Sequence, residues 1–460
     1  MPIDDVVAAV KDHNRRAPQV SLYRDYDQGR HRYPFATEAF KKDYLWILQN
    51  ARENMCPAVI RSFTDLVTVQ AWSGDGADAA NALAETLPLK RIVNLTVREA
   101  HRTGDGYVLV WPDTKGVSRP WYHRADQVVY RPSADDPEEF DWVAKLWVID
   151  TPGDSFGKGR INVYYADRVE RWITQGKVQH DELAAPDWPE GDTSYLPFVG
   201  EDGSETITHT YGRVPWVHMA FDADAQGGHG RSLLRDVVPL QDGLNKSVAD
   251  LIVGSESFAR PLRALMNYQA EIKIDPTTGR PVEEKLQFDP TKQSILGVRG
   301  PGPLQQLDPP DATRLTAVQE AFASKIARVV GMPVTEVLPD IGNVPSGAAL
   351  RVLAARRTNA VRDFEQDNAA ALVRMMALLG VENAFPEWAD PAPIDGTERL
   401  EIAQAKSDLG YPLAEVLPDL GEDPDDIKRI MQARDDENAN AGAAAVRAFR
   451  AGQDPNEAVR

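Results

Sequence analysis

The most constraining feature of this sequence is a long segment without helix breakers. No glycine or proline occurs from Ala348 to Leu379, and Ser346 and Gly380 can cap its two ends. At ~1.5 Å per residue the segment predicts a helix about 50 Å long. Its apolar residues share one stripe, which we expect to be buried throughout: Leu350, Leu353, Val361, Phe364, Leu372, Met375 and Leu379. Such a helix favours an extended scaffold or an assembly element over a compact enzyme core.

The composition excludes several classes of protein. The 460 residues include 51 Lys plus Arg against 70 Asp plus Glu, a formal charge of −19, which argues against a broad nucleic-acid-binding face. Cys56 is the only cysteine, so an intramolecular disulfide framework, a zinc finger and an iron–sulfur cluster are all excluded. The acidic N-terminus and the lack of an apolar run of ~20 residues predict a soluble, unprocessed chain without a membrane span.

The first half of the chain reads as helices followed by strands. Residues 40–66 carry apolar positions at helical spacing interrupted by Pro57, which predicts a helix, a break and a second helix. The region from about 90 to 220 is expected to be rich in antiparallel strands, beginning with a hairpin around Thr103-Gly-Asp-Gly106. Further strands are expected at 127–131, 142–149, 161–165 and 169–174. Seven of the ten tryptophans lie between Trp111 and Trp216, where we expect them to pack the sheets.

Helical periodicity returns after Gly230. One apolar stripe runs from Leu240 to Phe258 and should stop before Pro261, and small residues at Gly243, Ser247 and Gly254 would let another backbone come close. Residues 261–310 are rich in Pro and Gly and predict a compact insertion of hairpins and loops. Asp308-Pro-Pro-Asp311 then predicts the start of a helix that ends at Gly331.

The last 80 residues are strongly acidic. They hold 18 acids and 8 bases, a net charge of 8 − 18 = −10. Helical segments are expected near 397–409, 413–418, 424–436 and 441–451.

Several short motifs come close to a known chemistry without completing it. Residues 153–159 resemble a phosphate-binding loop but depart from it in two ways. One residue is missing between the two glycines, and no hydroxyl residue follows Lys158. Residues 222–227 start like a calcium loop, yet Leu233 stands where a bidentate Glu is required. The eight histidines show no metal-ligand spacing, and the adjacent acids at 135–136 and 138–139 lie in a polar stretch. No constellation here predicts an enzyme.

The order of elements resembles the portal proteins of tailed bacteriophages, of the siphophage type. The resemblance runs from about Tyr23 to Asp426 and is most specific in Gly230-Arg-Ser-Leu-Leu-Arg-Asp-Val-Val-Pro-Leu-Gln-Asp-Gly-Leu-Asn-Lys. It also rests on residues 54–69, on Gly212-Arg-Val-Pro-Trp-Val, on Gly331-Met-Pro and on Pro345-Ser-Gly-Ala-Ala-Leu350. None of these is a catalytic fingerprint, so the weight comes from their order and spacing.

The resemblance implies an α+β, portal-type subunit. Its expected parts are a mixed α/β wing at 1–228, a stem helix at 229–260, a small clip insertion at 261–310, a second stem helix at 311–331, a tunnel loop at 332–345, a long wing helix at 346–380, and an acidic helical crown at 381–460.

The same resemblance implies a structural function without catalysis, cofactor, metal or membrane. It implies a dodecameric ring at one capsid vertex, through which double-stranded DNA is packaged and ejected. The implied partners are the terminase large subunit, the head-to-tail adaptor, the major capsid protein and the scaffold. The protein would reside in the virion, and in the host cytoplasm during assembly.

The candidate site residues follow from this assignment. In the tunnel loop they are Glu336, Pro339, Asp340 and Asn343; residues 332–345 contain no Lys or Arg, so the loop would not hold a passing duplex. In the stem, Lys246, Lys325 and Arg328 would contact phosphates weakly or, equally well, form salt bridges between subunits. Gly243, Ser247 and Gly254 would pack against a neighbouring subunit.

Two other classes stay open. A hydrolase would place its active site in the β-rich region, using the acids near 135–139 or the loop at 153–159. A capsid scaffold or adaptor without a channel would bind other proteins through the long helix.

Overall fold

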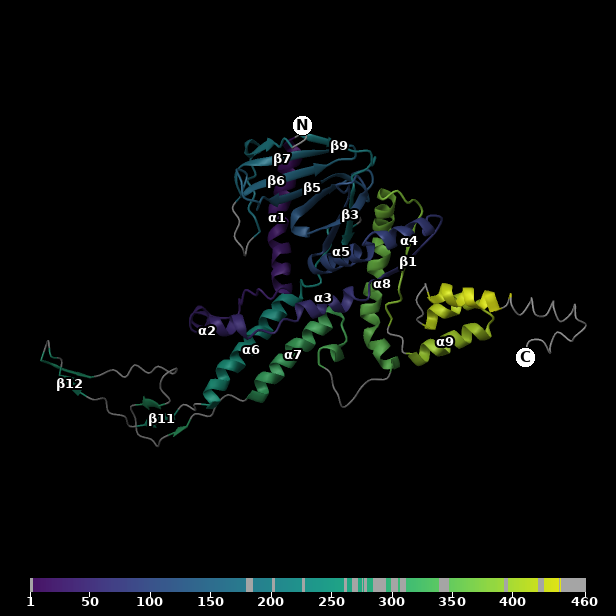
Figure 1. Cartoon of the computed structure of the whole chain (residues 1–460). Coiled ribbons are helices and arrows are strands. Elements are labelled where there is room, and N and C mark those ends of the chain that lie inside the picture. The colour runs from purple at the N-terminus through teal and green to yellow at the C-terminus, as the bar shows by residue number, and fades with distance from the viewer. Residues whose placement is uncertain are drawn as a thin grey trace, which may run out of the picture. The chain divides into compact units, whose positions relative to one another are not determined.

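The computed structural model describes most of the chain, and it mixes helices with antiparallel sheets (Figure 1). The described residues are 3–178, 185–200, 203–225, 228–259, 312–338, 347–392, 396–420, 426–437 and 439, with short segments at 263–266, 272–274, 276, 279–283, 295–298 and 305–306. The predicted α+β class is confirmed. The chain forms two compact units, Met1–Gly342 with Ala355–Pro391, and Asn343–Ala354 with Ala392–Arg460.

Two sheets are stacked in the first unit. The larger has the order β4-β5-β6-β7-β8, with β9 also paired to β7, and the smaller has the order β10-β2-β3. Their strands are β2 (Asp105–Pro112), β3 (Ser118–His123), β4 (Val128–Pro132), β5 (Phe140–Val148), β6 (Lys158–Tyr164), β7 (Arg168–Lys177), β8 (Tyr195–Pro197), β9 (Thr206–Thr208) and β10 (Trp216–Ala220). All pairings in both sheets are antiparallel, so the β-rich region and its four later strands are confirmed.

Alternating side chains explain how the sheets are layered. On β2, Tyr107 and Leu109 point into a core shared with the larger sheet, whereas Val108 and Val110 face a core with helices α5 and α8. On β5, Trp142 and the other residues of its face pack under helix α1, so the larger sheet is covered on both faces. The expectation of core tryptophans holds for Trp142, Trp172, Trp188 and Trp216, but Trp121 is 45% exposed.

Helix α1 (Ile3–Asp27) begins the chain and was not predicted from the sequence. Pro18 lies inside it, and polar residues surround a narrow apolar stripe. The buried stripe includes Val6, Val10, Ala17 and Val20. Helix α1 is thus stabilised by the sheet that it covers rather than by its own sequence.

The predicted helix, break and helix at 40–66 are confirmed. Helix α2 (Glu38–Asn50) is kinked at Tyr44 and begins at Thr37, whose side chain accepts a hydrogen bond from the amide of Phe40. Helix α3 (Cys56–Thr64) carries Pro57 in its first turn, where a missing amide hydrogen costs nothing.

The hairpin expected around residues 103–106 is wrong in its first arm. Residues 97–102 belong to helix α5 (Leu89–Thr103), which ends at Gly104 with φ +102° and leads into β2. Apolar residues such as Val93, Val97 and Ala100 fall at helical spacing and are buried, and this three- to four-residue period outweighs the short alternation.

Helices α6 (Val237–Ala259) and α7 (Ala312–Val330) pack side by side and run in opposite directions (Figure 1). Helix α6 stops before Pro261 as expected, and α7 ends at Gly331 with φ +80°. The predicted helix 229–260 starts too early, because residues 229–232 have no regular structure and residues 233–236 form turns. Ser232 Oγ donates to the Arg102 carbonyl, and the Leu233 amide donates to the His101 carbonyl. The 3-10 turn η3 (Val334–Glu336) follows α7.

Short strands are described within 261–310. Strands β12 (Ile272–Ile274) and β13 (Pro281–Glu283) form an antiparallel hairpin. Strand β11 (Arg263–Met266) pairs in parallel with β14 (Ile295–Val298) and antiparallel with β15 (Gln305–Gln306). The N-cap expected at 308–311 lies outside the described residues.

The long helix is confirmed as α8 (Gly347–Leu378), although the proposed cap Ser346 lies outside the described residues. Val361, Phe364, Leu372 and Met375 are buried, but Leu353 is 48% exposed. The expectation of a stripe buried along the whole helix is therefore wrong at its N-terminal end.

The remaining elements complete the two units. In the first, β1 (Val69–Ser73) pairs with β16 (Phe385–Trp388), and α4 (Ala77–Thr86) lies between β1 and α5 in sequence. In the second, α9 (Gly396–Asp408), α10 (Leu413–Val416), η4 (Leu417–Leu420) and helical residues 426–437 match three predicted helices. The helix expected at 441–451 lies outside the described residues.

No helix in the described part of the chain combines the length and apolarity needed to cross a bilayer.

Candidate functional site

The polar residues of the segment 241–245 fix the start of α6 to the rest of the unit. The Gln241 side-chain oxygen accepts from the Met55 amide at 2.9 Å, and that of Asn245 accepts from the Glu53 amide at 3.1 Å. The Tyr26 hydroxyl donates to Asp242 at 2.7 Å, and burial raises the pKa of Asp242 to about 6. The most specific stretch of the sequence thus positions a helix instead of forming a reaction centre.

The turn before α6 is held by two glycines whose backbones nearly touch. A Cβ at Gly230 would lie 2.0 Å from the Gly104 carbonyl oxygen, so no larger residue fits. The Gly230 amide donates to Asp105 at 3.0 Å. The chain entering α6 is therefore anchored directly on β2.

Asp105 is the centre of a buried cluster that the sequence did not reveal. His218 Nε2 lies 2.7 Å from Asp105 Oδ1, His229 Nδ1 lies 3.6 Å from Oδ2, and the Arg16 guanidinium pairs with Oδ2. Burial alone would raise the pKa of Asp105, but hydrogen bonds from His218 and His229 and the charge of Arg16 hold it well below its usual range.

Asp105, His218 and His229 have the donor types of a divalent-cation site, and their ligand atoms lie within 4.8 Å of one another. However, Arg16 already neutralises the carboxylate, and a second cation beside a buried guanidinium is strongly disfavoured. The arrangement fits a hydrogen-bonded cluster that joins α1, β2, β10 and the turn at Gly230 better than a metal site.

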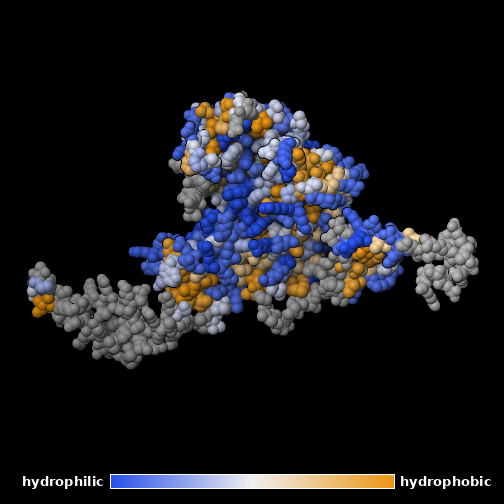
Figure 2. All heavy atoms as spheres, in the orientation of Figure 1, coloured by the Kyte–Doolittle hydropathy of each residue, from blue (hydrophilic) through white to orange (hydrophobic). Residues whose placement is uncertain are grey.

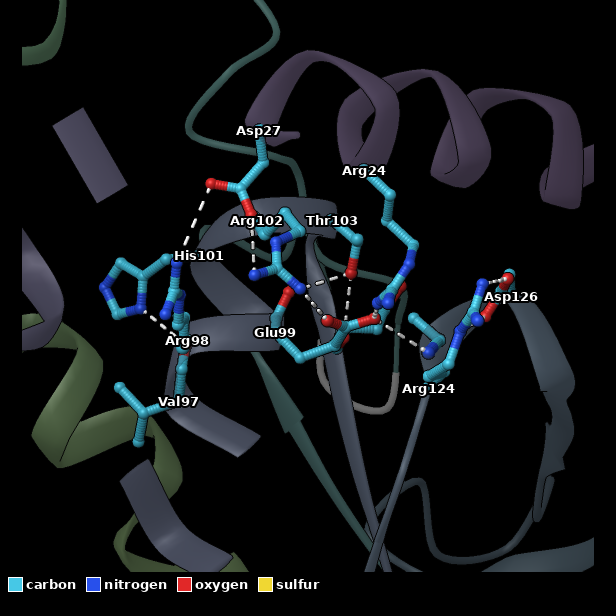
Figure 3. Close-up of polar contacts among 12 residues, drawn as sticks. Arg24, Asp27, Val97, Arg98, Glu99, His101, Arg102, Thr103, Arg124 and Asp126 are labelled. Carbon is cyan, nitrogen blue, oxygen red and sulfur yellow. Dashed lines mark hydrogen bonds and ion pairs between the residues drawn. The ribbon is translucent and has the colours of Figure 1, made fainter. Parts of the chain in front are cut away.

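A second buried network fixes α1 to α5 (Figure 3). Glu99 is fully buried and pairs with Arg24 of α1 and, at 2.8 Å, with Arg102 of its own helix. Arg102 also lies 2.7 Å from Asp27. The Glu99 carboxylate accepts from the Ala125 amide at 3.1 Å as well, so it links the helices to the turn before β4. Every charge here has a partner, as buried charges require.

The predicted tunnel-loop residues are only partly described. Glu336 lies in η3, and Arg357 of α8 donates to its carboxylate at 2.6 Å. This pairing neutralises an acid expected to line a channel, although Glu336 stays 39% exposed at its side chain. Pro339, Asp340 and Asn343 lie outside the described residues.

The three predicted stem cations differ in their surroundings. Lys246 pairs with Asp250 one turn along α6 and lies 4.3 Å from the centre of the Phe40 ring, so it is engaged within the chain. Lys325 lies over Phe322, and Arg328 Nε donates to the Ser324 carbonyl at 3.4 Å. Both are exposed, and neither pairs with an acid among the described residues. Their contact with phosphates or with a neighbour stays a prediction.

The predicted packing residues bring two helices of one chain together. A Cβ at Gly243 would lie 2.5 Å from the ring of Phe322, so the close approach at this glycine is made by α7 of the same chain. The Ser247 carbonyl accepts from the Gln319 side chain at 3.3 Å, and Ser247 Oγ donates to the Leu244 carbonyl. Gly254 is buried. A role of Ser247 and Gly254 in subunit packing stays a prediction.

Two pockets of the described part of the chain do not include the residues of the hydrolase hypothesis. One, of about 500 Å³, is lined by α1, β4, β5 and His229; the other, of about 800 Å³, lies at the start of α5. Residues 135–139 and 153–159 line neither. Glu139 pairs with Arg374 at 2.8 Å, and the Glu138 amide donates to Asp136 at 3.0 Å, so these acids serve local structure.

Comparison with known proteins agrees with this structural character. Residues 89–407 match the family model described as phage portal protein, SPP1 Gp6-like, which is more than half of the chain. This defines a structural protein of a phage-type particle. The chain belongs to the SPP1 Gp6-like phage portal protein family.

Solved structures that match the chain include those of gene transfer agent (GTA) particles. The neck of a native GTA particle with C12 symmetry is 14% identical, covers 81% of this chain and 94% of its own, and has a TM-score of 0.42. A GTA virion structure is 14% identical over 81% and 90% of the two chains, with a TM-score of 0.43. The neck of an empty particle with C6 symmetry is 13% identical over 83% and 93%, with a TM-score of 0.40. No curated protein matches the chain.

Proposed function

We propose that this protein assembles into a dodecameric ring at one vertex of a phage capsid and that double-stranded DNA passes through the ring in packaging and ejection. The observation that carries the proposal is the family match over residues 89–407. The polar clusters of the described residues support it, because their hydrogen bonds and ion pairs join helices and strands of the subunit. The protein itself would turn over no substrate.

Two roles stay open for the exposed cations near the start of the proposed tunnel loop. Lys325 and Arg328 are exposed on α7, whereas Glu336 is paired with Arg357. In the ring these two cations would either contact phosphates weakly or form salt bridges to a neighbouring subunit. In this arrangement Glu336, Pro339, Asp340 and Asn343 would face the channel.

The same proposal assigns the other partners. Residues 261–310 would dock the terminase large subunit and later the head-to-tail adaptor. The major capsid protein and the scaffold would hold the ring in the capsid. The protein would be found in the virion, and in the host cytoplasm before assembly.

Native mass spectrometry and negative-stain electron microscopy of the purified protein test the ring. We expect a high-order oligomer with a central hole. A species that stays monomeric or dimeric at every protein concentration, with and without capsid and scaffold proteins, would refute the proposal. Binding of a DNA duplex at several salt concentrations tests the channel contact: a weaker salt dependence in Lys325→Gln with Arg328→Gln than in the exposed control Lys115→Gln would assign these cations to phosphates, and an unchanged one would assign them to the contact between subunits.

A further inference from the structure

Helices α2 and α7 lie on opposite sides of α6. Ile47 and Leu48 of α2 share a core with Ala249, Ile252 and Val253 of α6. Phe322 of α7 lies against Gly243 of α6. Residues 243 and 249 are separated by well over a quarter turn at ~100° per residue, so the two neighbours contact different faces of α6. The three helices form a layer with α2 at one edge and α7 at the other (Figure 1).

The α2 edge exposes large apolar side chains. Trp46 is 61% exposed, Leu45 is 44% exposed, and Phe35, just before the helix, is 55% exposed. Figure 2 shows hydrophobic residues gathered at this end of the molecule beside hydrophilic ones. Exposed aromatic residues that cluster in this way are typical of protein interfaces. Exposed Asp43 gives the edge an acid, and exposed Lys42 gives it a base.

The α7 edge exposes a second, different stripe. Val318 is 43% exposed and Val329 is 42% exposed, and exposed Ala321 lies between them at helical spacing. Lys325 and Arg328 are exposed along the same stripe. This edge therefore pairs small apolar residues with positive charge, whereas the α2 edge carries large apolar residues and charges of both signs.

We infer that the α2 edge of one copy packs on the α7 edge of the next copy, with Trp46 against the stripe of Val318, Ala321 and Val329. The inference rests on the proposed ring, because only a closed ring of identical copies covers both edges of every copy. Asp43 would then face Lys325 and Arg328, which have no acidic partner among the described residues. The contact is heterologous, so two α2 edges do not pack on each other.

Cross-linking tests the pairing directly. Cys56 is the only cysteine and is buried, so introduced thiols can be linked selectively by a short bis-maleimide. We expect Trp46→Cys together with Val318→Cys to give a ladder of covalent oligomers on a denaturing gel. Each single variant should give monomers, and an equal mixture of the two should give dimers only. Ala321→Cys and Val329→Cys, each combined with Trp46→Cys, cover other registers along the stripe.

Charge substitutions provide a second readout that does not depend on linker reach. Trp46→Glu and Val318→Glu should each raise the protein concentration needed for half assembly by at least tenfold without lowering the melting temperature. Phe156→Glu is the matched control, because Phe156 is also exposed, at 48%, but lies in a turn before β6.

The outcomes separate this inference from the proposed function. If the wild type forms rings but none of the double-cysteine variants cross-links, or if both charge substitutions leave assembly unchanged, the interface is overturned and the portal function stays intact. Cross-linking of Trp46→Cys to itself overturns the heterologous pairing. A wild-type protein that never forms a ring overturns both.

Discussion

Arg357 donates a hydrogen bond to Glu336 across 2.6 Å, and this pair joins the buried side of α8 to the turn that follows α7. Arg357 is 8% exposed, so the pair is shielded from water on one side. It is the described contact that holds the beginning of the proposed tunnel loop on the long helix.

A double-mutant cycle measures the strength of this contact. Arg357→Ala, Glu336→Ala and the double variant should show a coupling free energy of about 1 kcal/mol in urea unfolding, the upper end for partly exposed pairs. We also expect faster proteolysis at η3 in both single variants. If the changes in the free energy of unfolding of the two single variants add up to that of the double variant, a direct contact is contradicted.

Gly243 should tolerate no branched side chain. Its Cβ would lie 2.5 Å from the Phe322 ring, so Gly243→Val should destabilise the protein by about 2 kcal/mol in thermal or urea unfolding. Gly176→Val is the matched control, because nothing lies within 4 Å of a Cβ at that position. Phe322→Ala should recover part of the loss in Gly243→Val, and the absence of any recovery would argue against this packing.

Glu99 should be among the most sensitive charges of the first compact unit. Glu99→Gln leaves Arg24 and Arg102 without their full charge partner, and we expect a loss of about 3 kcal/mol. Asp167→Asn breaks an exposed pair with Arg168, at 3.0 Å, and should cost under ~1 kcal/mol. Urea unfolding followed by circular dichroism distinguishes the two; equal losses would mean that burial does not strengthen the network.

Glu365 on α8 should make stability depend on pH. It is 5% exposed, and burial raises its pKa to about 7 from an ordinary value of 4.5. The folded state holds the Glu365 proton more tightly than the unfolded state. The contribution of Glu365 to the free energy of unfolding is therefore most favourable below pH 4.5 and is lost as pH rises from about 4.5 to about 7.

Glu365→Gln removes this dependence. Relative to wild type, we expect the variant to gain about 2 kcal/mol between pH 5 and pH 7.5 in urea unfolding. Asp363→Asn, on the exposed side of the same helix, is the control and should track the wild type. A constant difference between Glu365→Gln and wild type at every pH would contradict the assignment.

The sequence predicted best the helices whose ends carry strong local signals. Pro261 ends α6, Gly331 ends α7 and Gly380 follows α8, and all three helices were expected within a few residues except for the early start of α6. Helix α1 was missed because its weak apolar stripe becomes informative only when the sheet that it covers is known. Helix α5 was mistaken for a strand because residues 97–102 also alternate.

The candidate site was harder to predict because its contacts join distant parts of the chain. Asp105 and His218 are 113 residues apart, so no local spacing announces their cluster. Sequence reasoning correctly expected a close neighbour at Gly243 but could not tell a helix of the same chain from one in another copy. The clusters at Gln241 and Asn245 depend on backbone groups of residues 53–55, which carry no side-chain signature.

The antiparallel pairing of α6 and α7 also determines what a change in the length of their connection would cost. The chain leaves this frame at Ala259 and returns at Ala312, beside the helix that it left. The entropy of closing a connection grows slowly with its length, by about 0.6 kcal/mol for each doubling. Residues 260–311 can therefore change in length at a small entropic cost while α6 and α7 stay paired.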